Sequence, residues 1–251
     1  TMMYSYPSPT AIDVFYTNSE GYLITPEVLP YGEYSLVEVQ APYGYVLDKT
    51  PVSFSVSSEN AEEENSLTIV KVEKQNTAQK GKISVHKTGD IFTSVATASS
   101  AYTNENGEMI VNPTTYTPVF ANGDLSGAVF QITAKEDIVT LDGTIRAYAG
   151  DVVSEITTDE NGYAETEPLY LGKYEVREIK APYGYVLNNE PKDVELTYAG
   201  QEFEVRDTVN TAFENEYQSV RISLSKVMES DELFGIYGKD CYTSIRFGLF
   251  A

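Results

Sequence analysis

Short runs in which apolar and polar residues alternate dominate the sequence. This period of two is typical of β-strands that bury one face. The clearest runs are residues 82–88, 127–133, 173–179, 192–198, 201–207 and 220–226. Turn-forming Asn-Gly and Asp-Gly pairs stand between several of them. No segment shows a sustained helical stripe, so the sequence predicts an all-β fold of packed sheets, an Ig-like β-sandwich.

The chain also contains a tandem repeat. The segment GEYSLVEVQAPYGYVL from Gly32 and the segment GKYEVREIKAPYGYVL from Gly172 agree at ten of sixteen positions, 140 residues apart. Units of that length bury about two-thirds of their unfolded surface and need no disulfide. We expect residues 1–80 to be the C-terminal part of one domain, residues 81–218 a complete domain, and residues 219–251 the N-terminal part of a further domain.

Residues 88–126, inside the complete domain, are rich in Ser, Thr and Asn. We interpret them as an extended insertion between two strands. Surface loops tolerate insertion at small entropic cost, so the stretch is either decoration or a recognition element.

Composition and charge exclude several classes of protein. Among 251 residues, 17 are Lys or Arg and 38 are Asp or Glu, and the formal net charge of −21 opposes binding to nucleic acid or anionic lipid. No apolar run of about eighteen residues occurs, so no membrane insertion is expected. Neither a leader nor a wall-sorting signal is found, and we expect an interior segment of a longer protein. The single cysteine, Cys241, excludes an intrachain disulfide.

Signatures of conventional catalytic and metal sites are weak. The one histidine, His86, points outward by strand parity and has no cysteine nearby, so we expect it to be solvent-exposed and predict neither a Cys-His pair nor a metal site. Acidic turns such as residues 104–108 lack the alternating carboxylates of a calcium loop. No phosphate-binding loop appears, and no cofactor is expected.

Strand parity places three polar residues on the inward face of the complete domain. They are Lys87, Glu178 and Asn215, and each is in phase with an apolar residue two positions before it. Burying an isolated Lys or Glu costs several kcal/mol. The three residues therefore require either a mutual network or a reaction that removes the charge.

Lys, Asn and a carboxyl group in an apolar site can exchange an amide. Burial favours the uncharged amine of Lys87, which can attack the side-chain amide carbon of Asn215. Glu178 would polarise the amide oxygen and move protons. Ammonia leaves, and a cross-link then joins the first strand of the domain to its last. Because this reaction consumes its own side chains once, a turnover enzyme is not expected.

The same pattern recurs in the other units. Asn76 precedes Lys87 by eleven residues, and Asn215 precedes Lys226 by eleven, which places the units directly end to end. Glu38 occupies the matching glutamate position of the first repeat. Glu38 and Asn76 in the first unit, and Lys226 in the last, are therefore partial sites.

The Ala-Pro-Tyr-Gly-Tyr motif predicts a corner after the glutamate strand. Pro182 would end the strand, Gly184 would supply a positive φ, and Tyr185 would fill the edge of the sandwich. Such a corner would hold Glu178 at a set depth, although a purely structural corner explains the motif as well.

The segments ISVHKTGD, LSGAVFQI, GKYEVREIKAPYGYVL and FENE, in that order, resemble the Cna-B (SpaA-type pilin) domain, the transthyretin-like β-sandwich of Gram-positive surface adhesins and pilins. The resemblance covers about residues 81–218. It implies an intramolecular isopeptide bond with Lys87 as nucleophile, Asn215 as acyl donor and Glu178 as catalytic acid. The insertion after Lys87 is longer than the family pattern leads one to expect.

Two functions follow from the resemblance. The first is a structural stalk or fibre segment of a Gram-positive cell-surface adhesin or pilus-like protein, outside the cell and associated with its wall. The second is a ligand-binding adhesin module that holds a host matrix protein or glycan through residues 88–126.

The two ends of the sequence suggest a further partner. When both ends of the sequence are aligned with the repeat, the last residues of the chain fall just before the position at which Thr1 falls. Adjacent copies of the chain could therefore join head to tail, with Lys226 of one chain bonded to Asn76 of the next and Glu38 assisting. The alternative is a fragment cut from a longer array.

Overall fold

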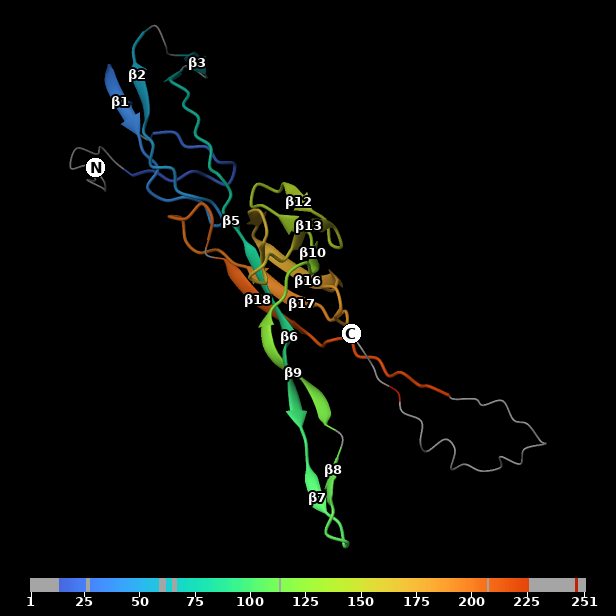
Figure 1. Ribbon diagram of the computed structural model, residues 1–251. Helices are drawn as coiled ribbons and strands as arrows, with labels where there is room; N and C mark the ends of the chain where they lie inside the picture. The colour runs from blue at the N-terminus through green and yellow to red at the C-terminus, as the bar shows by residue number, and fades with distance from the viewer. Residues whose placement is uncertain are drawn as a thin grey trace. The chain divides into compact units, whose positions relative to one another are not determined.

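The structure of the chain is a computed structural model that describes residues 14–25, 28–58, 62–64, 67–112, 114–206, 208–225 and 247. Two compact units are present, residues 1–217 and 218–251. The described residues form strands and turns without any helix, which confirms the all-β fold (Figure 1). That part of the chain accordingly offers no helix long and apolar enough to cross a membrane. Lys226 and Cys241 lie outside the described residues.

Residues 81–217 contribute two packed sheets to the first unit. The antiparallel sheet has the order β13-β10-β16-β17, formed by Val152–Thr157, Val129–Ala134, Gly172–Lys180 and Lys192–Leu196. The other sheet has the order β14-β6-β18, formed by Tyr163–Glu165, Ile83–Ala98 and Val209–Asn215. In this second sheet β14 is antiparallel to β6, whereas β18 is parallel to it.

Apolar side chains from the two sheets meet between them. Phe130 of β10 contacts Phe213 of β18, with ring centroids 4.8 Å apart. The other buried apolar residues of this core are Ile83, Val85, Ala128, Ile132, Ala134, Ile138, Ile156, Ala164, Tyr174, Val176, Val194 and Leu196. On β6, β10 and β16 they recur at every second position, so burial of one face of each strand stabilises the sandwich.

Short antiparallel pairs complete the described fold. They are β1 (Gly32–Leu36) with β2 (Val52–Val56), β3 (Glu62–Glu64) with β4 (Leu67–Ile69), β5 (Lys80–Gly81) with β15 (Leu169–Tyr170), β7 (Ala101–Thr103) with β8 (Met109–Val111), and β11 (Ile138–Val139) with β12 (Ile145–Ala147).

Two predicted strands are absent from the described residues. Residues 201–206 form a turn and a loop, with only an isolated bridge between Val205 and Lys80. Residues 220–225 are likewise outside any strand. The first error has a physical cause, because the backbone oxygen of Gln201 accepts a hydrogen bond from Leu47 of the first repeat instead of joining a sheet.

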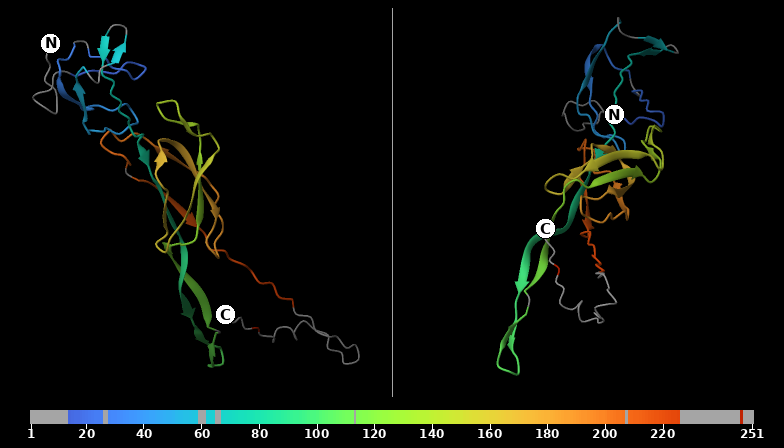
Figure 2. Two further views of the ribbon diagram at one scale, coloured as in Figure 1. Left: turned by 90° about the horizontal axis from the view of Figure 1, so that it is seen from above. Right: turned by 45° about the vertical axis from the view of Figure 1, so that its right-hand side comes forward.

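The insertion is a β-ribbon rather than a loop. Strand β6 continues to Ala98 and pairs antiparallel with β9 (Thr115–Asp124), with β7 and β8 nearer the tip (Figures 1 and 2). A register shift interrupts the pairing between Phe92 and Ser94. Thr, Val and aromatic residues recur through the stretch and favour strands despite its polar composition. We call residues 90–122 the insertion ribbon.

Candidate functional site

The two sheets bring Lys87, Glu178 and Asn215 together in the core. Glu178 lies on β16 of one sheet, whereas Lys87 and Asn215 lie on the neighbouring parallel strands β6 and β18 of the other. The exposed fraction is 0% for Lys87 and Glu178 and 2% for Asn215. All three side chains therefore face inward, as strand parity predicts, and the site spans the sandwich.

The three side chains form one hydrogen-bonded network. Lys87 Nζ donates to Asn215 Oδ1 at 2.6 Å. Asn215 Nδ2 donates to Glu178 Oε1 at 2.9 Å, and the same carboxylate oxygen lies 3.5 Å from Lys87 Nζ. Within the described residues, no buried side-chain nitrogen or oxygen lacks a hydrogen-bond partner. The network thus offsets the cost of burying two ionisable groups.

The carboxylate faces the amide nitrogen of Asn215, not its oxygen. We expected Glu178 both to polarise the amide oxygen and to move protons. In the structure the amine of Lys87, not the carboxylate of Glu178, forms a hydrogen bond with the amide oxygen of Asn215. Of the two expected roles for Glu178, this arrangement supports proton transfer.

A corner after β16 holds the second oxygen of Glu178. The backbone amide of Asn188 donates to Glu178 Oε2 at 3.0 Å. Strand β16 ends at Lys180, two residues before Pro182, and Gly184 has a φ of 86°. The positive φ expected at Gly184 is therefore confirmed, and the returning chain fixes the position of the carboxylate.

Burial is the main electrostatic influence on the lysine. Removal from water lowers the pKa of Lys87 below its ordinary value, while the charge of Glu178 acts in the opposite direction. The ring of Phe213 lies 6.0 Å from Nζ and helps to exclude water. A lowered pKa increases the fraction of uncharged amine, which is the nucleophilic form.

Two glycines allow the strands to approach closely around this network. A Cβ on Gly89 would lie 2.5 Å from the backbone oxygen of Asn215, and a Cβ on Gly162 would lie 2.4 Å from that of Lys87. Neither glycine was singled out from the sequence, nor was Asn188. Gly162 belongs to an Asp-Glu-Asn-Gly turn, and the sequence does not say what that turn packs against.

The first repeat contains the matching glutamate and asparagine. Asn76 Nδ2 lies 2.9 Å from Glu38 Oε1 and 2.8 Å from Glu38 Oε2. The amide of Asp48 donates to Glu38 Oε2 at 3.0 Å, as that of Asn188 does to Glu178. Among the described residues, no lysine amine bonds to this pair. Lys226, the third partial-site residue, falls outside them.

His86 differs from its prediction. It is half-buried rather than solvent-exposed, its ring stacks on Tyr163 with centroids 4.2 Å apart, and its Nε2 lies 2.9 Å from Asp124 Oδ1. The neighbouring strand covers the ring, which parity alone does not reveal. In the part of the chain that the structure describes, no group of three or more His, Cys, Asp or Glu side chains is placed to hold a metal ion.

Comparison with known proteins identifies the family. The sequence profile described as "SpaA: Prealbumin-like fold domain" matches residues 8–71 and 119–211, which is more than half of the chain. The chain therefore belongs to the SpaA prealbumin-like fold family, and the resemblance inferred from the sequence is confirmed. The matched ranges contain Glu38 and Glu178 but not Lys87, Asn76 or Asn215.

Three individual proteins to which the chain is similar share at most 29% sequence identity with it. The trypsin-resistant surface T6 protein of Streptococcus pyogenes serotype M6 is 29% identical over 94 residues, which cover 38% of this chain and 16% of that protein. The Bacillus anthracis TIE protein has a TM-score of 0.46 and 24% identity, covering 81% of this chain and 28% of that one. GBS52, the minor pilin of Streptococcus agalactiae, has a TM-score of 0.33 and 16% identity, with coverages of 75% and 66%.

Proposed function

We propose that the chain is a stalk or fibre segment of a Gram-positive surface adhesin or pilus-like protein, located outside the cell on its wall. Its complete domain would be stabilised by an isopeptide bond between Lys87 and Asn215. One observation carries the proposal: Glu178 Oε1 lies 2.9 Å from the amide nitrogen of Asn215 and 3.5 Å from the amine of Lys87. A single carboxylate oxygen can therefore take a proton from one nitrogen and deliver it to the other.

The reaction needs no external reagent. The uncharged amine of Lys87 attacks the side-chain carbonyl carbon of Asn215 and forms a C–N bond. The proton that the amine loses passes through Glu178 to the amide nitrogen, the bond between that nitrogen and the carbonyl carbon breaks, and ammonia leaves. One amine and one primary amide become one secondary amide and one ammonia. The domain is consumed as its own substrate, so this is a single turnover and not enzymatic activity.

The bond would suit a structural segment. It replaces the ionisable amine of Lys87 by a neutral amide in the core and joins the first strand of the domain to its last. Separating β6 from β18 would then require breaking a covalent bond. Resistance to force and to proteolysis follows, because both depend on opening of the native sandwich.

Intact mass spectrometry of the full chain tests this function. The monomeric form of the unmodified chain should be lighter than its sequence mass by one ammonia, and the monomeric form of the Glu178→Ala variant should have its full sequence mass. Glu175→Ala is the matched control, since Glu175 lies on the opposite face of the same strand and pairs with Arg177. A full sequence mass for the unmodified chain, or a lost ammonia in the Glu178→Ala variant, would contradict the proposal.

We further propose that the partial sites join copies of the chain. As in the Glu178–Asn215 pair, the amide nitrogen of Asn76 donates to the carboxylate of its glutamate, Glu38, here to both oxygens. Lys226 of one chain would supply the amine to Asn76 of the next, and Glu38 would transfer the proton. The result is a head-to-tail covalent filament.

Complementation of two variants on a denaturing gel tests the filament. Lys226→Ala and Asn76→Ala chains should each run as a single band, because neither can polymerise alone. Their mixture should yield a covalent dimer, since one variant keeps Asn76 and the other keeps Lys226. Unmodified chain should show a ladder, and a single band at chain mass would refute the proposal.

The insertion ribbon supports a second candidate function, an adhesin module that binds a host matrix protein or glycan. Large apolar side chains are exposed along it. They include Phe92, Val95, Tyr102, Met109, Val111 and Tyr116. Exposed apolar patches of this kind mark interaction surfaces. Deleting the ribbon should abolish attachment to host matrix if this function holds, and unchanged attachment would exclude it.

A further inference from the structure

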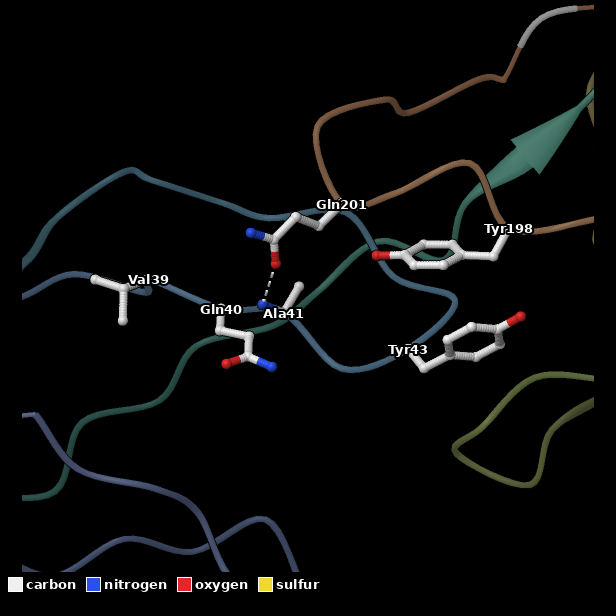
Figure 3. Close-up of a pocket in the computed structure, with 6 residues that line it drawn as sticks. All are labelled: Val39, Gln40, Ala41, Tyr43, Tyr198 and Gln201. Carbon is white, nitrogen blue, oxygen red and sulfur yellow. Dashed lines mark hydrogen bonds between the residues drawn. The ribbon is translucent and has the colours of Figure 1, made fainter. Parts of the chain in front are cut away.

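The first repeat contacts the next domain through its Ala-Pro-Tyr-Gly-Tyr corner. The backbone amide of Ala41 donates to Gln201 Oε1 at 2.9 Å, and that of Leu47 donates to the backbone oxygen of Gln201 at 2.8 Å. The rings of Tyr43 and Tyr198 lie side by side, with centroids 4.7 Å apart (Figure 3). The corner of one repeat therefore binds the loop between β17 and β18 of the following domain. We call residues 197–206 the receiving loop.

A buried glutamine closes this junction. Gln79 stands between the first repeat and β6, and only 1% of it is exposed. Its Nε2 donates to the backbone oxygens of Gly200 and Phe203, each at 2.7 Å, and its Oε1 accepts from the amide of Ala199 at 2.7 Å. A side chain with three such bonds to one loop is a built contact, because each bond satisfies a backbone group of the receiving loop.

The second repeat carries the same corner. Residues 181–187 have the same sequence as residues 41–47. The corners also close in the same way, because the isolated bridge between Tyr45 and Ala78 has its counterpart between Tyr185 and Tyr217. Gln218 follows Asn215 by three residues, as Gln79 follows Asn76. The half of the junction that binds a receiving loop is therefore present twice.

Of the two corners, residues 181–187 are more exposed than residues 41–47. Ala41 is buried, whereas Ala181 is not. Tyr183 is 103% exposed, compared with 72% for Tyr43 beside the receiving loop. Val186 and Leu187 add further exposed apolar surface.

We propose that residues 181–187 form a docking surface for the receiving loop of another copy of this repeat. The occupant is specified by the chain itself, since the same seven-residue corner already binds that loop once. Tyr183 would lie against the copy's Tyr198, and the amides of Ala181 and Leu187 would donate to the copy's Gln201, as those of Ala41 and Leu47 do. One contact differs: Lys49 pairs with Glu202 at 3.0 Å, whereas Asn189 stands at the matching position of the second corner.

This inference deepens the proposed stalk function, because it specifies how successive repeats of a fibre meet, but it depends neither on the isopeptide chemistry nor on the head-to-tail filament. The junction between the first repeat and the receiving loop consists of hydrogen bonds, a ring contact and the Lys49–Glu202 ion pair, without a covalent bond. Failure of the docking experiment would leave the Lys87–Asn215 mass test unaffected, and failure of the mass test would leave the docking surface in place.

Thiol cross-linking in an extended chain tests the inference. The chain would contain residues 1–218 followed directly by a second copy of residues 80–218, which reproduces the spacing that follows Gln79. Asn189→Cys in the first copy and Glu202→Cys in the second would be joined by a short bismaleimide. The positive control is the pair Lys49→Cys and Glu202→Cys in the 251-residue chain carrying Cys241→Ser. Cross-linked peptides would be quantified by mass spectrometry.

We expect the Asn189→Cys pair to cross-link about tenfold more than a pair that uses Glu155→Cys, an exposed strand position of the same copy. Tyr183→Ala should reduce this excess, and Tyr43→Ala should do the same to the positive control, because Tyr43 contacts Tyr198. Equal yields for the Asn189→Cys and Glu155→Cys pairs would overturn the proposal. So would an excess that persists unchanged in the Tyr183→Ala variant.

Discussion

Lys87 and Asn215 are joined by a 2.6 Å hydrogen bond from Nζ to Oδ1, across two parallel neighbouring strands. The strand register sets this bond, since Lys87 pairs with Phe213 and Gly89 pairs with Asn215. A slip of one residue would turn one of the two side chains to solvent. The fold therefore brings the amine to the amide before any chemistry occurs.

The buried amine predicts how stability depends on pH when the bond cannot form. In the Glu178→Gln variant the folded chain should keep a Lys87 pKa below its ordinary 10.5. The unfolded chain then binds more protons, so the free energy of unfolding rises with pH between the folded pKa and 10.5. Urea unfolding at stepped pH measures this slope. The double variant Lys87→Met with Glu178→Gln is the control, and an identical slope in both variants would contradict the prediction.

Gly162→Ala should impair both stability and bond formation. Its Cβ would meet the backbone oxygen of Lys87 at 2.4 Å, and its φ is +73°. Gly143→Ala is the matched control, because Gly143 has a φ of +81° with nothing within 4 Å of its Cβ. We expect a loss of about 1 kcal/mol for Gly143→Ala and about 2–4 kcal/mol for Gly162→Ala. Urea unfolding gives the losses, and a mass time course gives the rate of ammonia release. Equal losses of stability in the Gly162→Ala and Gly143→Ala variants would show that the close contact between Gly162 and the backbone of Lys87 does not affect stability.

Gln79→Ala should loosen the junction between the first repeat and residues 197–206. Three backbone groups of residues 197–206 would lose their partner, at about 1–3 kcal/mol. Hydrogen exchange of the Leu47 amide, which bonds to Gln201, should accelerate. Gln131→Ala removes a glutamine whose single bond, to Glu155, lies on the surface, and should leave that exchange unchanged. Unaltered exchange at Leu47 in the Gln79→Ala variant would count against the junction.

Removal of the insertion ribbon should leave the sandwich intact. Asp90 and Asn122 are register partners, so residues 91–121 can be replaced by an Asn-Gly turn. The described core cluster has no member in the deleted stretch. We therefore expect the free energy of unfolding, measured in urea, to change by less than about 1 kcal/mol. Ammonia loss by mass should persist. Failure of the shortened chain to lose ammonia would mean that the ribbon supports the site.

Strand parity was enough to orient the candidate site. Because a half-buried strand repeats every two residues, the phase of Val85 and Val176 specifies where Lys87 and Glu178 point. Periodicity does not name a strand's neighbour. The meeting of the first and last strands was expected because a buried Lys, Glu and Asn need one another as partners, and the chemical roles of the three residues stay predictions until the mass measurement is made.

The alternation of apolar and polar residues gave a wrong strand prediction where the backbone of a segment bonds to the first repeat instead of to a neighbouring strand. Residues 201–206 alternate as a strand does, yet the backbone of Gln201 bonds to Leu47 and that of Glu204 bonds to Lys80. Whether such a segment forms a strand depends on contacts with residues that are far away in the sequence. Lys49 and Glu202, which form an ion pair, are 153 residues apart. Yet the equal spacing of Gln79 and Gln218 after their asparagines was visible in the sequence, and was the signal available for the junction.

The placement of the insertion has a mechanical consequence. Residues 90–122 lie between Lys87 and Asn215 in the chain, whereas β6 and β18 lie side by side. In the fibre that we propose, a bond between Lys87 and Asn215 would pass tension directly from one residue to the other and would bypass the residues between them. The insertion ribbon would then not be stretched when the fibre is pulled. A segment that carries no load could change its length and sequence freely, which would suit a ribbon whose apolar side chains are exposed.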